Sequence, residues 1–262
     1  TTEIYTLSLH DALPILALSS HVSGEADIIC NYYTIDSGKR KFVFKGLRKS
    51  KKRSLSATEP GTVANIVYYH REDRGSFIVN DVSTEKYYSS FSADLKKIFH
   101  LYFILECVEK TTGYDARDEA LFRLLLAAIE VLSKTNYPSH LTAFFTLRLM
   151  KGHGILPDLA ACKICGKKIS SQFTLDVIDL RPVCGMCLAD DPGGPVQGSA
   201  LLSRDMIVYV DECNVKKFSE INLGRYPEED VLNLIFTYAL FMENYFHWEL
   251  KSKSFILSAR YR

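Results

Sequence analysis

Four cysteines in the second half of the chain have the residue type and the spacing of a metal site. They form two C-x2-C pairs that are separated by eighteen residues, first Cys162 and Cys165, then Cys184 and Cys187. Two residues between paired thiols allow a tight turn to direct both sulfurs at one ion, and the gap is long enough for a short hairpin. Four thiolates complete the tetrahedral set that Zn²⁺ prefers. We therefore predict a structural zinc site in a small lobe at 160–190.

Two other uses of these thiols stay open from the sequence alone, a redox dithiol and a disulfide. A zinc ion with four thiolates carries net negative charge, which nearby cations would offset. The basic residues close to the cysteines in sequence are Lys163, Lys167, Lys168 and Arg181.

The composition is that of a folded protein from a reducing compartment. Cys30, Cys107 and Cys213 are scattered and make the cysteine count odd, which disfavours a secreted disulfide framework. A chain of 262 residues with 47% hydrophobic content is able to bury a substantial core. No apolar run is long enough to span a membrane, and the run at 12–18 lacks the preceding Lys or Arg of a secretory signal. We expect a cytoplasmic, nucleoid-associated protein.

Positive charge is concentrated in one stretch although the formal net charge is only +1. Residues 39–53 contain nine basic residues and no acidic one, a field that attracts phosphates. Nearby Tyr32, Tyr33, Phe42 and Phe44 would stack bases if they lay on a barrel face, although such residues are more often core. The alternative is a solvated, disordered loop. The candidate nucleic-acid-binding residues are Lys39, Arg40, Lys41, Lys45, Arg48, Lys49, Lys51, Lys52 and Arg53.

The first ninety residues have the pattern of a small β-barrel. Short hydrophobic runs alternate with turn signals that contain Gly, Pro, Asp and Ser. Five strands in about seventy residues are typical of an OB-type barrel, a fold that commonly binds single strands. The predicted strands are 16–20, 27–34, 40–45, 65–70 and 76–80. We predict an OB-fold DNA-binding domain at 16–90.

From residue 91 the hydrophobic period becomes helical, so the predicted fold class is α+β. We expect a helical domain at 91–262 that carries the zinc lobe. Leu95 and Tyr102 belong to the first apolar stripe, and a long last helix is expected from Pro227 to beyond Lys253. The apolar stripes run over 91–105, 121–132 and 141–149.

Catalytic signatures are missing from the sequence. It contains no G-x-x-x-x-G-K-[ST], G-x-G-x-x-G, H-E-x-x-H or G-x-S-x-G. The fragment 182–187 is close to the P-C-x-x-C half of a zinc deaminase, but one residue intervenes and no upstream H-x-E supplies a ligand and a proton shuttle. We predict no enzyme activity and no cofactor other than zinc. A zinc-dependent nucleic-acid enzyme and a zinc-stapled protein-interaction module are the alternatives.

Four separated motifs, together with the cysteine frame, resemble the bacterial recombination mediator RecO family. The motifs are GEADII at 24–29, KGLRKSKKR at 45–53, LPDL at 156–159 and ELKS at 249–252. The resemblance covers the chain from about residue 16 to its end. It implies an OB barrel, a helical domain and often a zinc lobe. It also implies binding of single- and double-stranded DNA, strand annealing, and work with RecR to load RecA onto strands coated by single-strand-binding protein.

Residues 1–15 depart from the resemblance, because the family has a first strand that begins with Met. The run at 7–15 is similar to translated sequencing-adaptor read-through. We therefore expect a foreign or unstructured extension at 1–15, with an ordinary native extension as the alternative. If the segment replaced native residues, the first barrel strand would be incomplete.

Overall fold

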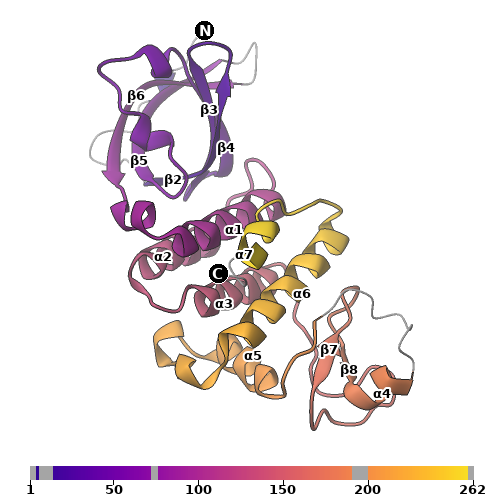
Figure 1. The fold of residues 1–262 in the computed structure, drawn as a ribbon. Coiled ribbons are helices and arrows are strands. Elements are labelled where there is room, and N and C mark those ends of the chain that lie inside the picture. Colours follow the sequence, from indigo (N-terminus) through magenta and orange to yellow (C-terminus); the bar gives the residue numbers. More distant parts are fainter. Residues whose placement is uncertain (1–3, 6–13, 72–75, 191–199, 259–262) are drawn as a thin grey trace. The chain divides into compact units, whose positions relative to one another are not determined.

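The computed structural model describes residues 4–5, 14–71, 76–190 and 200–258, and every structural statement below refers to these residues. The chain divides into two compact units, residues 1–134 and residues 135–262. Each unit is described by itself (Figure 1).

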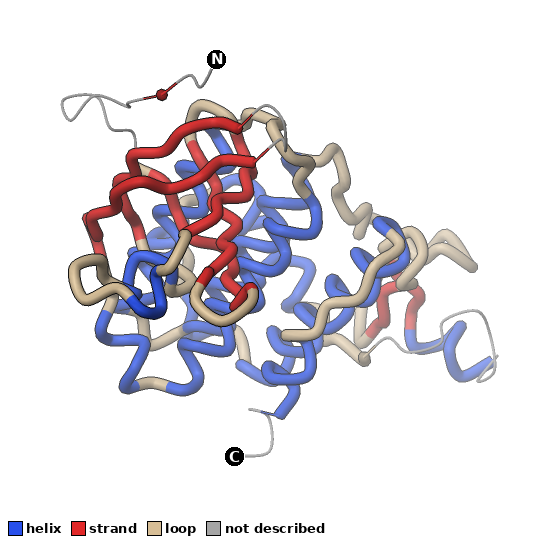
Figure 2. Tube along the Cα trace, turned by 90° about the horizontal axis from the view of Figure 1, so that it is seen from above, coloured by secondary structure: helices blue, strands red, loops and turns tan. Residues whose placement is uncertain are grey.

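The first unit contains a closed barrel of five strands. Its strands are β2 (Ile15–Ser23), β3 (Asp27–Thr34), β4 (Gly38–Phe44), β5 (Val63–Arg71) and β6 (Ser76–Lys86). The pairing order is β5-β2-β3-β4-β6, and β6 pairs again with β5, which closes the ring. All pairs are antiparallel except β4 with β6. Figure 2 shows the strands in red. The predicted OB-type barrel is confirmed.

The segment expected to lie outside the fold contributes to the sheet. A two-residue strand, β1 (Ile4–Tyr5), pairs with β5 through Ile4 and Tyr69. Ile15 opens β2 and is 3% exposed in the barrel core. The barrel therefore starts one residue before the predicted boundary, because Ile15 pairs with both β3 and β5. The remaining residues of the predicted extension, 1–3 and 6–13, lie outside the described residues.

Two helices belong to the same unit as the barrel, α1 (Leu95–Thr111) and α2 (Glu119–Lys134). The Asp94 side chain accepts from the backbone N–H of Lys97 at 3.1 Å and caps α1. Leu95 and Tyr102 are 52% and 42% exposed, so their predicted place in the core was wrong. Because α1 contacts both β2 and α2, its buried face is centred on Leu101, Ile104 and their neighbours instead.

Aromatic residues of β3 and β4 fill the barrel. Tyr32, Phe42 and Phe44 are at most 1% exposed, and the rings of Tyr32 and Phe42 meet edge to face at 5.7 Å. Tyr33 points out of the barrel and stacks on Phe122 of α2 at 6.4 Å. Since all four candidate rings are buried, the base-stacking role considered for them does not hold.

The second unit is built on helices. They are α3 (Pro138–Gly152), α5 (Asp205–Val215), α6 (Glu228–Phe246) and α7 (Lys253–Ser258). The long last helix expected to reach Lys253 is in fact two helices. His247 has φ 58°, a left-handed conformation that ends α6. The Glu243 carboxylate then accepts from the Leu250 backbone and from the Lys253 ammonium, at 2.7 and 2.5 Å, which fixes the break.

The cysteine lobe lies within the second unit. It contains the strands β7 (Phe173–Leu175) and β8 (Pro182–Cys184) and the short helix α4 (Gly185–Asp190). The two strands pair antiparallel, so the short hairpin expected between the cysteine pairs is present. No helix in the described ranges is both long and apolar enough to cross a membrane.

Candidate metal centre and candidate nucleic-acid interface

The four cysteines come from a turn, a strand end and a helix. Cys162 and Cys165 lie on a tight turn in which the Gly166 backbone N–H donates to the Cys162 carbonyl at 2.9 Å. Gly166 has φ 70°, which a residue without Cβ adopts freely. Cys184 ends β8, and Cys187 lies in the first turn of α4. The hairpin therefore brings the second pair to the first.

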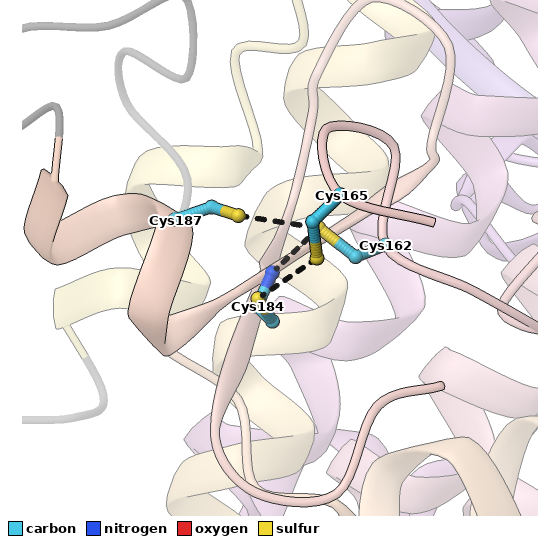
Figure 3. Close-up of side chains that lie close together, drawn as sticks. All are labelled: Cys162, Cys165, Cys184 and Cys187. Atoms are coloured by element: carbon cyan, nitrogen blue, oxygen red, sulfur yellow. Dashed lines mark hydrogen bonds between the residues drawn. The ribbon is translucent and has the colours of Figure 1, made fainter. Parts of the chain in front are cut away.

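The distances between the sulfur atoms fit one tetrahedral ion. Cys162 Sγ is 3.9 Å from Cys187 Sγ, and Cys165 Sγ is 3.8 Å from Cys184 Sγ (Figure 3). All four sulfur atoms lie within 4.8 Å of one another. A tetrahedron with Zn–S bonds of about 2.3 Å has edges of roughly 3.8 Å. The cluster is thus able to hold a metal ion with four thiolate ligands.

The electrostatics of the cluster favour a cation. Burial raises the pKa of Cys162, but hydrogen bonds from backbone groups of Cys165, Cys184 and Ile164 more than offset it and lower the pKa to about 6. One of these donors is the Cys184 N–H, 3.4 Å from Cys162 Sγ. Desolvation and contact with the other three sulfurs raise the pKa of Cys187 to about 12. Four adjacent thiolates repel one another, and a bound cation removes that repulsion.

Lys163 does not have the role that its position in the sequence indicated. Its ammonium lies 2.5 Å from Asp176 and 3.0 Å from Asp179. These two carboxylates therefore neutralise the Lys163 charge, and Lys163 does not offset the charge of the thiolates. Asp176 was not singled out in the sequence, because a lone acid after a three-residue strand has no distinguishing pattern. Lys167, Lys168 and Arg181, the other nearby cations, are exposed.

Six of the nine candidate DNA-binding residues lie on one ordered loop at the barrel edge. The loop at 45–53 includes a 3-10 helix, η1 (Leu47–Lys49), and it rests on the turn between β2 and β3. The Arg48 backbone N–H donates to the Ala26 carbonyl at 3.0 Å. In OB folds, the loop between the first two strands is a ligand-binding loop. The six residues are Lys45, Arg48, Lys49, Lys51, Lys52 and Arg53.

Some of these charges also hold the loop in place. Lys45 pairs with Asp27 at 2.6 Å, and Lys49 pairs with Glu25 at 3.1 Å. Arg48 donates to the Glu25 carbonyl, and Arg53 to the Lys45 carbonyl. The loop is therefore folded, contrary to the alternative of a disordered segment. The described residues show no ion pair for Lys41, Lys51 and Lys52, which are exposed.

The remaining candidates, on β4, are placed differently. Lys39 is 7% exposed, its ammonium donates to the Glu109 carbonyl at 2.5 Å, and it lies 4.7 Å from the centre of the Tyr114 ring. Desolvation lowers the pKa of Lys39. Arg40 pairs with Asp115 at 2.6 Å and is about one quarter exposed. The Lys39 side chain is thus buried against α1 and Tyr114, whereas Lys41 is exposed like most of the loop residues.

Two family models match successive parts of the chain. The N-terminal model of recombination protein O matches residues 14–88, and its C-terminal model matches residues 92–253. The first model ends at residue 88 and the second begins at residue 92, just after the barrel strands. The boundary between the two compact units lies later in the sequence, after α2.

Curated relatives of this chain bear the name DNA repair protein RecO. The relative from Caldanaerobacter subterraneus subsp. tengcongensis is 24% identical over 246 residues, which cover 92% of this chain and 95% of the relative. The relative from Pelodictyon phaeoclathratiforme is 29% identical over 184 residues, 68% of this chain and 69% of its own length. Because the two family models together cover nearly all of the barrel and of the helical part, the chain belongs to the recombination protein O family of DNA repair proteins.

Proposed function

We propose that this chain is a recombination mediator that acts on DNA without catalysis. It binds single- and double-stranded DNA through the basic loop of its barrel and anneals complementary strands. With RecR, it helps to load RecA onto strands coated by single-strand-binding protein. The observation that carries the proposal is a loop with six basic residues that is held on the β2–β3 turn of an OB-type barrel.

The geometry of the loop supports binding through phosphates. Five of its six basic residues are exposed, on a loop that backbone and side-chain hydrogen bonds fix to the barrel. Contacts to phosphates position a protein on DNA without reading its sequence. Such contacts suit a protein that has to act on strands of any sequence, both single and paired.

We propose that the metal is a structural Zn²⁺ held by Cys162, Cys165, Cys184 and Cys187. The four sulfurs supply the complete tetrahedral set, so no position stays open for water or substrate. A closed site favours a stapling role over the alternative of a zinc-dependent enzyme. Nucleotide or nucleobase turnover that survives repurification and disappears on mutation of one His or Glu would contradict the proposal.

A strand-annealing assay tests the proposal. Complementary strands, bare or coated with single-strand-binding protein, are mixed with the purified chain, with and without RecR. We expect annealing of bare strands by the chain alone and RecA loading on coated strands with RecR. A chain that binds RecR but neither binds nor anneals DNA would be a protein-interaction module instead.

A further inference from the structure

A pocket of about 250 Å³ opens in the first unit where β6 leads into α1. Three segments form its wall: residues 59–62 before β5, residues 87–92 after β6, and residues 98–102 of α1. Neither the basic loop nor the cysteine cluster contributes to it. Its lining is mainly aromatic and apolar, with Tyr87, Tyr88, Phe91, Ile98, Leu101 and Tyr102.

One wall of the pocket is fixed and the rim is open. The Tyr88 hydroxyl donates to the Glu130 carboxylate at 3.2 Å, and the Tyr88 and Phe91 rings lie 5.7 Å apart. Tyr87 and Tyr102, by contrast, are 44% and 42% exposed. Large rings held at this exposure beside a pocket present flat apolar faces to a ligand, which is how proteins stack unpaired bases.

The polar group at the rim distinguishes between ligands. Glu59 lines the pocket, its side chain is exposed, and the described residues show no partner for its carboxylate. A carboxylate repels phosphates and acidic peptides, but it accepts hydrogen bonds from the amino groups of cytosine and adenine. The pocket therefore fits the base of a nucleotide rather than its phosphate.

A short, anchored segment connects the pocket to the basic loop. Glu59 lies six positions after Arg53 in the sequence, a span of at most about 21 Å. Between them, the 3-10 helix η2 (Leu55–Thr58) is tied to the barrel, because Tyr32 donates to the Ala57 carbonyl at 2.7 Å. A strand that occupies the roughly 4–16 nucleotides of an OB fold covers this span.

We propose that the pocket takes one unstacked base of single-stranded DNA. The base lies against Tyr87 or Tyr102 with its amino edge toward Glu59, while neighbouring phosphates follow the basic loop. This inference rests on the proposed DNA binding and adds a base-selective position to it. An apolar side chain of a protein partner is the competing occupant, and the unpaired carboxylate and the link to the basic loop favour the base.

The first test is the binding of oligo(dC) to a double variant, Tyr87→Ala with Tyr102→Ala, measured by fluorescence anisotropy at several salt concentrations. We expect affinity to fall about tenfold or more, because stacking on one ring contributes that much per base. The slope of log affinity against log salt stays unchanged, since no phosphate contact is removed. Tyr87→Phe with Tyr102→Phe retains the ring faces and binds normally. Tyr245→Ala, which removes an exposed ring outside the pocket, is the control.

The second test uses base identity. The parent chain should prefer oligo(dC) over oligo(dT), because thymine presents a carbonyl where cytosine presents an amino group. Glu59→Gln should reduce that preference, since an amide both accepts and donates.

The outcomes separate this inference from the function on which it rests. A folded double-alanine variant with parental affinity for oligo(dC), or a parent without base preference, overturns the pocket and leaves phosphate binding by the loop intact. A parent chain that binds no DNA overturns the proposed function itself. A double variant that keeps DNA binding and loses RecR or single-strand-binding protein shows that the pocket takes a peptide. Circular dichroism and thermal midpoints verify that the variants fold.

Discussion

The ammonium of Lys163 lies 2.5 Å from a carboxylate oxygen of Asp176, whose side chain is 1% exposed. Lys163 stands between the first two cysteines, and Asp176 directly follows β7. The Asp176 carboxylate also accepts from the Ile178 backbone N–H at 2.8 Å. The cysteine lobe is therefore held by two links between the same segments, the thiolate cluster and this ion pair.

Replacing Asp176 by Asn should destabilise the lobe even with metal bound. The change leaves a partly buried ammonium without its main counter-charge, which costs about 1–3 kcal/mol of unfolding free energy. Urea denaturation of metal-loaded protein measures the loss. Asp179→Asn is the control, because Asp179 lies farther from the Lys163 ammonium than Asp176 does and its side chain is more exposed. Equal effects of the two changes would contradict the role given to Asp176.

Metal content should depend on the four clustered cysteines alone. We expect about one zinc per chain, and Cys184→Ser should release it, because three thiolates hold the ion less well than a complete tetrahedral set. Elemental analysis after dialysis against a weak chelator gives the content. Cys213→Ala removes a buried thiol outside the cluster and should retain the ion. Unchanged zinc in Cys184→Ser would refute the assignment.

Removal of the metal should unfold the lobe locally. Its two strands have three residues each, and metal–thiolate bonds replace the core that so small a segment cannot form. Hydrogen exchange with and without a strong chelator should show loss of protection at residues 160–190 and retained protection in the barrel. Protection of the lobe that is unaffected by the chelator would argue against a structural metal.

The basic loop should determine the salt dependence of DNA binding. Lys51 and Lys52 on the loop, and Lys41 on β4 just before it, are exposed, and the described residues show no ion pair for their ammonium groups. Changing all three to Ala therefore removes charge without loosening the loop. Each phosphate contact on a single strand contributes about 0.7 to the slope of log affinity against log salt. The slope of the triple variant should therefore be smaller in magnitude by about two. Anisotropy titrations at several salt concentrations measure the slope.

A matched triple variant tests whether the effect is specific to the loop. Arg117, Arg123 and Lys134 are exposed residues of the same unit, and their replacement by Ala changes the net charge equally. We expect a nearly parental slope for this control. A loop variant with unchanged affinity and slope would place DNA binding elsewhere, on the helical part or on the lysines of the cysteine lobe.

Lys39 should behave as a structural residue. Lys39→Met removes its hydrogen bond to the Glu109 carbonyl and its contact with the Tyr114 ring, at a cost of about 1–2 kcal/mol in unfolding free energy. The salt slope of DNA binding should not change. A Lys39→Met variant with parental stability and a flatter salt slope of DNA binding would indicate that Lys39 contacts DNA.

Glu130 should titrate at unusually low pH. Hydrogen bonds from Lys134 and Lys86 lower its pKa from 4.5 to about 2. A lowered carboxyl pKa stabilises the folded state above the unfolded value, and that contribution is lost as pH falls from about 4.5 through 2. The carboxyl carbon shift of Glu130 measured by NMR gives the pKa directly. Lys86→Met should move it upward, whereas Lys49→Met should not.

The sequence by itself determined the features that depend on local periodicity and spacing. Short hydrophobic runs between turn signals predicted all five barrel strands, and a two-residue spacing of thiols predicted the cysteine cluster, because each pair needs only one tight turn. The same local rules failed at two places in the helices. They extended the last helix past His247, whose left-handed conformation ends it. They also placed Leu95 and Tyr102 in the core, although α1 buries other residues and leaves these two exposed.

Only the tertiary structure decided which charged and aromatic residues face solvent. Lys39 and Lys41 are two residues apart in one basic run, yet Lys39 is buried against α1 and Lys41 is exposed. Tyr32 fills the barrel, while Tyr87 and Tyr102 meet at a pocket from segments that are not adjacent in sequence. Burial depends on what packs against a side chain, and residues distant in sequence supply those contacts.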